Sequence, residues 1–208
     1  MEKYRNNTII FFGDSITDAS KSFNPNHPYG SGYVNMVKTE IEVYYSDLNI
    51  KIYNEGIGGN ETCHLLERFD EAITSKKPDL VFLYIGTNDV WHPYDNGSIP
   101  VNKDILERMT LIVNKIKDTG SKVVLLTPFI FPRGPRYDFF KELKQYMDSF
   151  YTAFINYLNR NNLEYIDLNA IMNQYSAVSN NRLTKDSVHP DIIGHGIIAQ
   201  AIIDYLNK

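Results

Sequence analysis

The sequence predicts an α/β protein in which a parallel sheet is covered by helices on both faces. Short apolar segments alternate with segments of helical hydrophobic spacing along the 208 residues, and several short segments are apolar at every position. Such alternation is typical of βαβ units, and continuous apolar character is typical of strands buried on both faces. The chain shows no linker, internal repeat or low-complexity segment, so we expect one domain over residues 1–208.

Five segments are predicted to be strands. Residues 8–12 and 80–85 are the clearest, because each is an uninterrupted apolar run followed at once by glycine. Residues 122–127 have the same character, residues 50–54 alternate between polar and apolar side chains, and residues 164–167 are a short fifth candidate. These strands are far enough apart in sequence for a helix to connect each to the next.

Helices are predicted wherever apolar residues recur at intervals of three and four. This spacing favours helices over residues 33–45, 62–73, 105–116 and 139–160, and a last helix that includes residues 197–205. Residues 168–184 are expected to contain a short helix and a loop, and proline, glycine and asparagine predict loops over residues 20–32 and 91–100.

Composition excludes several classes of function. The net charge is −4 and no run of lysine and arginine occurs, so we expect no binding to nucleic acid. No apolar run has the length of a membrane span, and the polar residues 1–7 leave no room for a signal-peptide core, so we expect no membrane insertion. The single cysteine, Cys63, cannot form an internal disulfide. We therefore expect a cytoplasmic protein if Met1 is the natural start.

Three predicted strands are followed by residues that suit nucleophilic catalysis. The segments are Gly-Asp-Ser at 13–15, Gly-Ile-Gly-Gly at 56–59 and Gly-Thr-Asn at 86–88. Because parallel strands end at one edge of the sheet, these segments should converge. A serine hydroxyl, glycine N–H groups and an asparagine amide are what acyl transfer to serine requires. Taken singly, each segment also suits a simple turn.

A base for Ser15 is found near the end of the chain. His189 follows Asp186 by three residues, just ahead of the last predicted helix. In a turn, this separation lets the carboxylate reach Nδ1 of the imidazole and leaves Nε2 to accept the proton of the serine. An isolated Asp-x-x-His is more often a surface loop, so this pair gains weight only beside the other segments.

Together, residues 13–15, 54–59, 86–89 and 186–190 resemble the four sequence blocks of the SGNH hydrolase superfamily, also called GDSL esterases and lipases. The blocks occur in the order that the family shows. The resemblance implies a flavodoxin-like, three-layer α/β/α sandwich with a five-stranded parallel sheet in the order 2-1-3-4-5. It also implies a carboxylic ester hydrolase, for which we expect no metal and no other cofactor.

The resemblance also implies roles for five residues. Ser15 matches the nucleophile, and its own backbone N–H matches one donor of the oxyanion hole. Gly59 matches the second donor through its N–H, and Asn88 matches the third through its side-chain amide. Asp186 and His189 match the orienting acid and the general base.

The assignment of Gly59 leaves Gly58 as an alternative. The family often has Gly-x-Thr at this point, whereas an extra residue separates Gly59 from Thr62 here. The glycines at 56–59 could also suggest a nucleotide site. We do not favour that interpretation, because the third glycine of a dinucleotide motif and the lysine of a phosphate loop are both missing from it.

Other chemically active side chains are expected to have structural roles. His195 lies inside the last predicted helix, where packing or capping is favoured. Cys63 and His64 are neighbours on a predicted helix and point in different directions, so a metal site or cysteine nucleophile is not favoured. Asp14 and Asp89 are expected to hold loops by accepting backbone N–H groups.

The predicted function is a serine esterase for short-chain carboxylic esters that works through an acyl-enzyme on Ser15. Residues 84–92 resemble family members that act on acetylated carbohydrates, such as acetylxylan esterases, so O-acetyl groups on a carbohydrate are the expected target, in a small-molecule or oligosaccharide ester. Trp91 and His92 are candidate substrate contacts in the predicted loop after Asn88, although Trp91 could equally plug the edge of the core.

Two alternatives remain open at this point. A lysophospholipase or thioesterase would use the same residues on longer acyl chains and would need a longer apolar channel. A non-catalytic, flavodoxin-like binding module would share the fold alone, since a fold does not decide function. The sequence makes no prediction of the oligomeric state.

Overall fold

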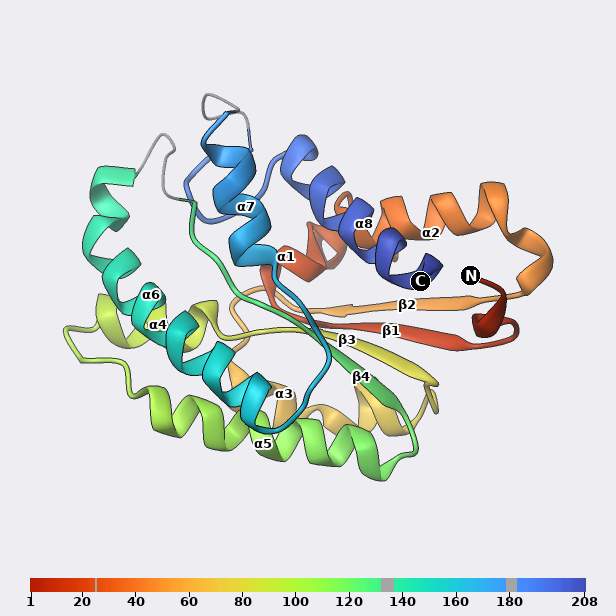
Figure 1. Ribbon diagram of the computed structural model, residues 1–208, viewed down its shortest axis with the longest axis horizontal. Helices are drawn as coiled ribbons and strands as arrows, with labels where there is room; N and C mark the ends of the chain where they lie inside the picture. The colour runs from red at the N-terminus through yellow and green to blue at the C-terminus, as the bar shows by residue number, and fades with distance from the viewer. Residues whose placement is uncertain (25, 132–136, 179–182) are drawn as a thin grey trace.

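The computed structural model describes residues 1–24, 26–131, 137–178 and 183–208, and a parallel sheet runs through its centre (Figure 1). The strands are β1 (Thr8–Gly13), β2 (Lys51–Gly56), β3 (Leu80–Tyr84), β4 (Lys122–Leu126) and β5 (Tyr165–Ile166). Their order is β2-β1-β3-β4-β5, and every neighbouring pair is parallel. The predicted class, the five-stranded sheet and its strand order are confirmed.

Helices cover both faces of this sheet, which gives three layers (Figure 1). The helices α2 (Tyr33–Tyr44), α7 (Leu168–Ser176) and α8 (Ile192–Asn207) pack on one face. The helices α3 (Thr62–Glu67), α4 (Thr87–Asp95), α5 (Asn102–Asp118) and α6 (Tyr137–Arg160) pack on the other.

Strand β1 contributes to both hydrophobic cores. Ile9 and Phe11 belong to the core under α2 and α8, whereas Ile10 and Phe12 belong to the core under α5 and α6. All four side chains are fully buried. Because burial of each such side chain stabilises the fold by about 1.5–3 kcal/mol, this strand is anchored firmly and its carboxyl end is a fixed point for the site.

The register brings three strand ends to one edge. Phe12 of β1 pairs with Glu55 of β2 and with Leu83 of β3, and the next residue, Gly13, pairs with Gly56 and Tyr84. The segments that follow these strands therefore start side by side, as the sequence predicted.

Two local predictions need correction, and one short helix was not predicted. Residues 91–95 were expected in a loop but belong to helix α4, because Pro93 lies in its last turn and the buried Val90 anchors the first. The helix expected over 62–73 ends at Glu67 and gives way to a π-helical segment, Asp70–Thr74. A short helix, α1 (Ser15–Asp18), follows β1 and is too brief to show helical periodicity.

Within the described residues, no helix combines the length and the apolar character needed to cross a membrane. The short helix expected within residues 168–184 is α7, and residues 179–182 of that segment lie outside the described part.

Candidate active site

Ser15 is the first residue of α1 and lies just beyond the end of β1. Asp14 caps this helix, because its Oδ1 accepts the N–H of Ile16 at 3.0 Å. Glycine is required at two neighbouring positions: a Cβ on Gly13 would collide with the carbonyl of Tyr84, and one on Gly56 would collide with the backbone of Asp18. The close approach of α1 to the strand ends fixes Ser15 at the edge of the sheet.

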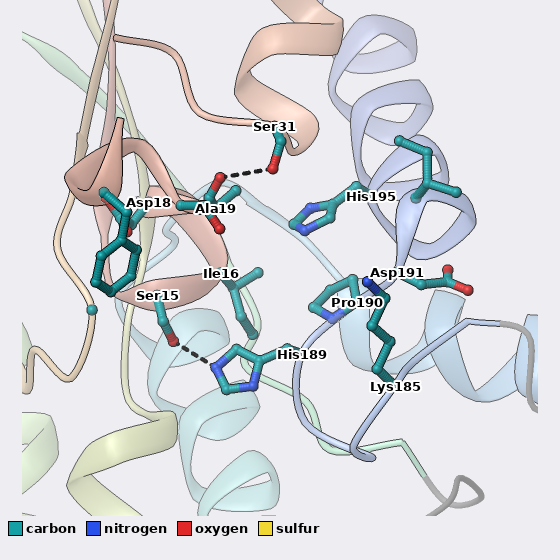
Figure 2. A pocket seen from close by; sticks show the side chains of 14 residues that line it. Ser15, Ile16, Asp18, Ala19, Ser31, Lys185, His189, Pro190, Asp191 and His195 are labelled. Atoms are coloured by element: carbon teal, nitrogen blue, oxygen red, sulfur yellow. Dashed lines mark hydrogen bonds between the residues drawn. The ribbon is translucent and has the colours of Figure 1, made fainter. Parts of the chain in front are cut away.

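A hydrogen-bonded chain joins Ser15 to His189 and Asp186. Ser15 Oγ lies 2.9 Å from Nε2 of His189, as Figure 2 shows, and Nδ1 of the same ring lies 2.7 Å from Asp186 Oδ2. An ionised carboxylate can only accept, so Nδ1 carries the ring proton and Nε2 accepts from the serine hydroxyl. The structure thus brings together three residues that the sequence analysis selected from opposite ends of the chain.

The loop that carries His189 is closed by its own side chains. Oδ1 of Asp186 accepts the N–H groups of Val188 and His189 at 2.9 and 2.7 Å. The hydroxyl of Thr184 donates to the carbonyl of His189 at 2.7 Å and accepts the N–H of Ser187 at 2.9 Å. One oxygen of Asp186 therefore builds the loop while the other orients the imidazole.

The same contacts set the charge of the pair. Burial alone would raise the pKa of Asp186, but hydrogen bonds from the His189 ring and from two backbone N–H groups outweigh it and lower that pKa to about 2. The hydrogen bond to Asp186 raises the pKa of His189 above its usual 6.5, and burial opposes this shift. Asp186 is therefore an anion at neutral pH.

Asp14 is a second carboxyl group at the site. It is buried, and burial raises its pKa to about 7, while the hydrogen bond from Ile16 opposes the shift. Its Oδ2 has no hydrogen-bond partner among the described residues. The prediction that Asp14 holds a loop by accepting a backbone N–H is confirmed.

The glycine turn after β2 borders the serine. The N–H of Asn60 donates to the carbonyl of Ile57 at 3.3 Å, and Gly59 has φ +78°, a left-handed conformation that favours glycine. Gly58 lines the same cleft as Ser15, and a Cβ on Gly58 would lie 3.9 Å from that of Ser15. Both candidate glycines thus lie in one turn at the strand ends.

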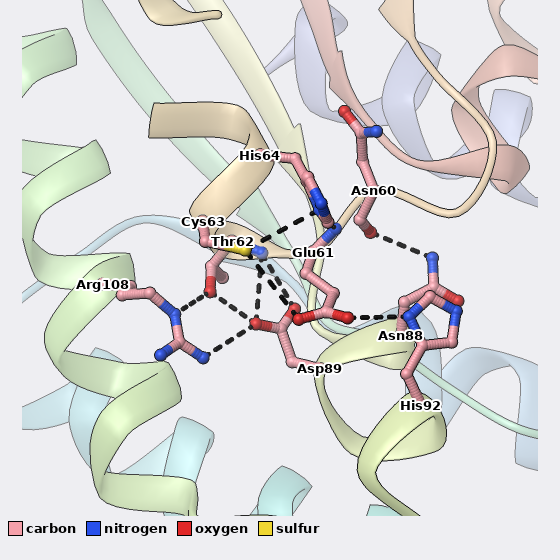
Figure 3. A network of polar contacts seen from close by, with 9 residues as sticks. All are labelled: Asn60, Glu61, Thr62, Cys63, His64, Asn88, Asp89, His92 and Arg108. Carbon is pink, nitrogen blue, oxygen red and sulfur yellow. Dashed lines mark hydrogen bonds and ion pairs between the residues drawn. The ribbon is translucent and has the colours of Figure 1, made fainter. Parts of the chain in front are cut away.

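Asn88 reaches this turn from helix α4. Its Nδ2 donates to the carbonyl of Asn60 at 2.9 Å (Figure 3), which fixes the orientation of the amide. The amide has a second hydrogen that can donate to another acceptor.

Arg68 is a positioning residue that the sequence analysis did not identify. Its Nε donates to Oδ1 of Asn60 at 2.7 Å, and its Nη2 donates to the carbonyls of Gly13 and Glu55 at 3.0 and 2.9 Å. One guanidinium therefore ties the ends of β1 and β2 to the turn that holds Asn88. The only signal in the sequence is an arginine between the apolar residues of a predicted helix, and this pattern does not identify the groups that the arginine contacts.

A buried carboxylate anchors the other end of the turn. Asp89 accepts the N–H of Thr62 at 3.1 Å, accepts its hydroxyl as well, and forms an ion pair with Arg108 at 3.2 Å (Figure 3). The expectation that Asp89 holds a loop by accepting a backbone N–H is confirmed. Thr62 is therefore held firmly in spite of the extra residue between Gly59 and Thr62.

Trp91 and His92 lie on α4 next to this network. Trp91 packs edge to face on Phe140, with 5.1 Å between ring centres, and Nδ1 of His92 lies 2.7 Å from Oε1 of Glu61. The interpretation of Trp91 as a plug at the edge of the core matches this packing. Neither residue is among the described residues that line the cleft beside Ser15, and their contacts with a substrate stay predictions.

The cleft beside Ser15 has a volume of about 450 Å³. Figure 2 shows residues of α1, of the His189 loop and of α8 around it. His195 lies on its α8 side and accepts the N–H of Tyr33 at 3.3 Å, which caps α2. Burial lowers the pKa of His195 to about 4, so the ring is neutral. The prediction of a packing or capping role for His195 is confirmed, because the buried ring accepts an N–H at the start of α2.

No cluster of three or more metal-ligating side chains occurs among the residues that the structure describes. Cys63 is partly buried, and burial raises the pKa of its thiol.

Comparisons with known proteins agree with this geometry. The GDSL-like lipase/acylhydrolase family matches residues 11–197. An acetylxylan esterase from Geobacillus stearothermophilus is 30% identical over 208 residues, which cover 94% of this chain and 91% of that protein.

Solved structures show the same fold. The crystal structure of Axe2, an acetylxylan esterase from Geobacillus stearothermophilus, has a TM-score of 0.83 at 27% identity and covers 100% of this chain and 97% of its own. LAE5, an α/β hydrolase from the metagenome of Lake Arreo in Spain, has a TM-score of 0.83 at 26% identity, with coverage of 98% and 96%. The chain therefore belongs to the GDSL-like lipase/acylhydrolase family, as its sequence blocks predicted, and is a carboxylic ester hydrolase.

Proposed function

We propose that the protein is a serine esterase that removes O-acetyl groups from a carbohydrate through an acyl-enzyme on Ser15. The observation that carries the proposal is the chain of hydrogen bonds from Ser15 through His189 to Asp186, open to a cleft. The acetylated carbohydrate is proposed because the acetylxylan esterase of Geobacillus stearothermophilus is similar over nearly the whole length of both chains.

In the proposed reaction, Nε2 of His189 takes the proton of Ser15 as Oγ attacks the ester carbonyl. The tetrahedral intermediate collapses, the ester C–O bond breaks, and His189 returns the proton to the leaving alcohol. A water molecule then repeats the sequence on the acyl-enzyme, which releases the acid and restores Ser15. Asp186 stabilises the imidazolium of His189 during both acylation and hydrolysis of the acyl-enzyme.

The oxyanion is proposed to be held by three donors: the N–H of Ser15, the N–H of Gly59 and the amide of Asn88. The Asn88 amide is oriented in advance by its bond to Asn60, so it needs no reorganisation during the reaction. Gly58 stays the alternative for the second donor, because it lines the cleft with Ser15.

Substitution Asn88→Ala is expected to lower kcat by about 10²–10³ and to change KM little, because the donor acts mainly on the transition state. Steady-state rates on p-nitrophenyl acetate measure this. Asn207→Ala, an exposed asparagine at the end of α8, is the matched control and should retain full activity. A loss seen only in KM would contradict the assigned role.

The rate should fall on the acid side, because His189 must be neutral to accept a proton. Since hydrogen bonding to Asp186 raises the pKa of His189, the midpoint of this fall in kcat/KM should lie above pH 6.5. The charge of Asp14 contributes to the same shift, so Asp14→Asn should move the midpoint to lower pH. A profile flat down to pH 5 would contradict His189 as the base.

Acyl-chain length tests the proposed substrate class. We expect kcat/KM on acetylated xylo-oligosaccharides and p-nitrophenyl acetate to exceed that on p-nitrophenyl laurate. A preference for the laurate would instead favour the lysophospholipase or thioesterase alternative. Absence of activity on all of these esters would contradict the proposed function.

We also propose a cytoplasmic location. The proposal is supported by the single cysteine: it cannot form an internal disulfide, so the fold does not depend on an oxidising compartment. Fractionation of the source cells tests it.

A further inference from the structure

Phe23 is an exposed aromatic residue at the cleft that no part of the proposed reaction uses. Its side chain is 89% exposed, yet it lines the same cleft as Ser15 and His189. Among the described lining residues, Phe23 alone carries a large hydrocarbon ring. An unburied phenyl ring at the edge of a reacting centre is available to a ligand.

The two residues before Phe23 are held by hydrogen bonds to α1 and to β2. They belong with Phe23 to a single 3₁₀ turn, Lys21–Phe23, within the loop that the sequence predicted. Asp18, which is buried, accepts both the N–H and the hydroxyl of Ser22 at 3.0 and 2.7 Å. Lys21 Nζ donates to the carbonyl of Asn54 at 2.8 Å. The ring is therefore presented from a braced turn.

The backbone before this turn is strained. Ala19 and Ser20 are consecutive residues with φ of +44° and +69°, a conformation that residues with a Cβ rarely adopt. Such strain persists only where the surrounding structure enforces it, and it is concentrated at functional sites. Here the positive φ angles of Ala19 and Ser20 direct the chain so that the turn Lys21–Phe23 lies alongside the cleft.

A polar hollow continues from the cleft past Ser20 and Ser31, which line both spaces. This hollow has a volume of about 350 Å³, and its other described lining residues are Asn24, His27, Gly30 and Asn35. Amides, hydroxyls and an imidazole offer both donors and acceptors, which suits a ligand rich in hydroxyl groups.

We propose that Phe23 is a stacking platform for the sugar that carries the acetyl group, and that the hollow lined by Asn35 receives the next sugar unit. A pyranose ring has an apolar C–H face that can cover an aromatic ring, while its hydroxyls need hydrogen-bonding partners. The phenyl ring on the braced turn supplies the apolar surface, and the adjoining polar hollow supplies the hydrogen-bonding partners. The inference rests on the proposed carbohydrate function and assigns its subsites.

The test compares substrates with and without sugar. kcat/KM is measured for the wild type and Phe23→Ala on ethyl acetate, acetylated xylose and acetylated xylobiose. Ethyl acetate is chosen because its leaving group has no ring to stack. We expect Phe23→Ala to lower kcat/KM about tenfold on both sugar acetates, mainly by raising KM, and to leave kcat/KM on ethyl acetate unchanged. A tenfold change corresponds to about 1.4 kcal/mol. Phe23→Tyr should retain wild-type rates.

The hollow is tested by Asn35→Ala, which should lower the rate on acetylated xylobiose more than on acetylated xylose. Tyr44→Ala removes an exposed aromatic ring at the far end of α2 and is the matched control for Phe23→Ala. Equal losses by Phe23→Ala on all three substrates, or no loss on any, would overturn the platform. A wild type active on ethyl acetate and inactive on both sugar acetates would instead overturn the carbohydrate function itself.

Discussion

Substitution of Ser15 by alanine is expected to lower kcat on acetyl esters by roughly 10⁵–10⁶. The substitution removes Oγ, which is proposed to form the acyl-enzyme and lies 2.9 Å from Nε2 of His189. The fold should be unaffected, because Asp14 caps α1 through the backbone N–H of Ile16 and not through the serine side chain.

Initial rates and thermal unfolding of the Ser15→Ala variant check this expectation together. Ser46→Ala is the matched control: Ser46 is exposed and begins a 3₁₀ turn just ahead of β2, at the opposite edge of the sheet from Ser15. An unchanged Tm with activity close to that of the wild type would exclude Ser15 as the nucleophile.

A large effect is also expected for Asp186→Asn, which should lower kcat by about 10⁴. The asparagine oxygen can still accept the N–H groups of Val188 and His189, so the loop should keep its shape. Its amide would then face Nδ1 as a donor, which favours the ring tautomer with hydrogen on Nε2. That tautomer cannot take the proton of the serine.

The pH dependence separates this effect from simple misfolding. Because Asp186 raises the pKa of His189, the remaining activity of Asp186→Asn should fall at a lower pH than that of the wild type. Asp118→Asn, an exposed aspartate at the end of α5, should alter neither kcat nor the profile. A loss smaller than tenfold would show that Asp186 does not orient the base.

Much of the fold followed from local patterns. The runs at residues 9–12 and 80–85 are apolar throughout because their side chains enter cores on both faces of the sheet. Residues 91–95 of α4 were predicted as a loop because Pro93 and the Asn-Gly pair at 96–97 are typical of loops, whereas the buried Val90 holds the start of the helix on the core. That packing is a tertiary effect which local patterns do not record.

The site was predictable where side chains follow strand ends. Ser15 directly follows β1, so the topology of a parallel sheet places it at the edge where the strands end. His189 lies 174 positions away in the loop before α8, and the Asp-x-x-His spacing and the family resemblance predicted its role. The role of Arg68 was not predictable, because two of its partners are the backbone carbonyls of Gly13 and Glu55. Carbonyl groups occur at every residue, and only the folded chain shows which ones converge.

Acid quenching during turnover of p-nitrophenyl acetate tests whether the acyl group passes through Ser15. Quenched protein is digested and its peptides are examined by mass spectrometry. We predict one acetyl group on the peptide that contains Ser15, absent after the same treatment of Ser15→Ala. An acetyl group on another residue during turnover, with Ser15 unmodified, would contradict the account.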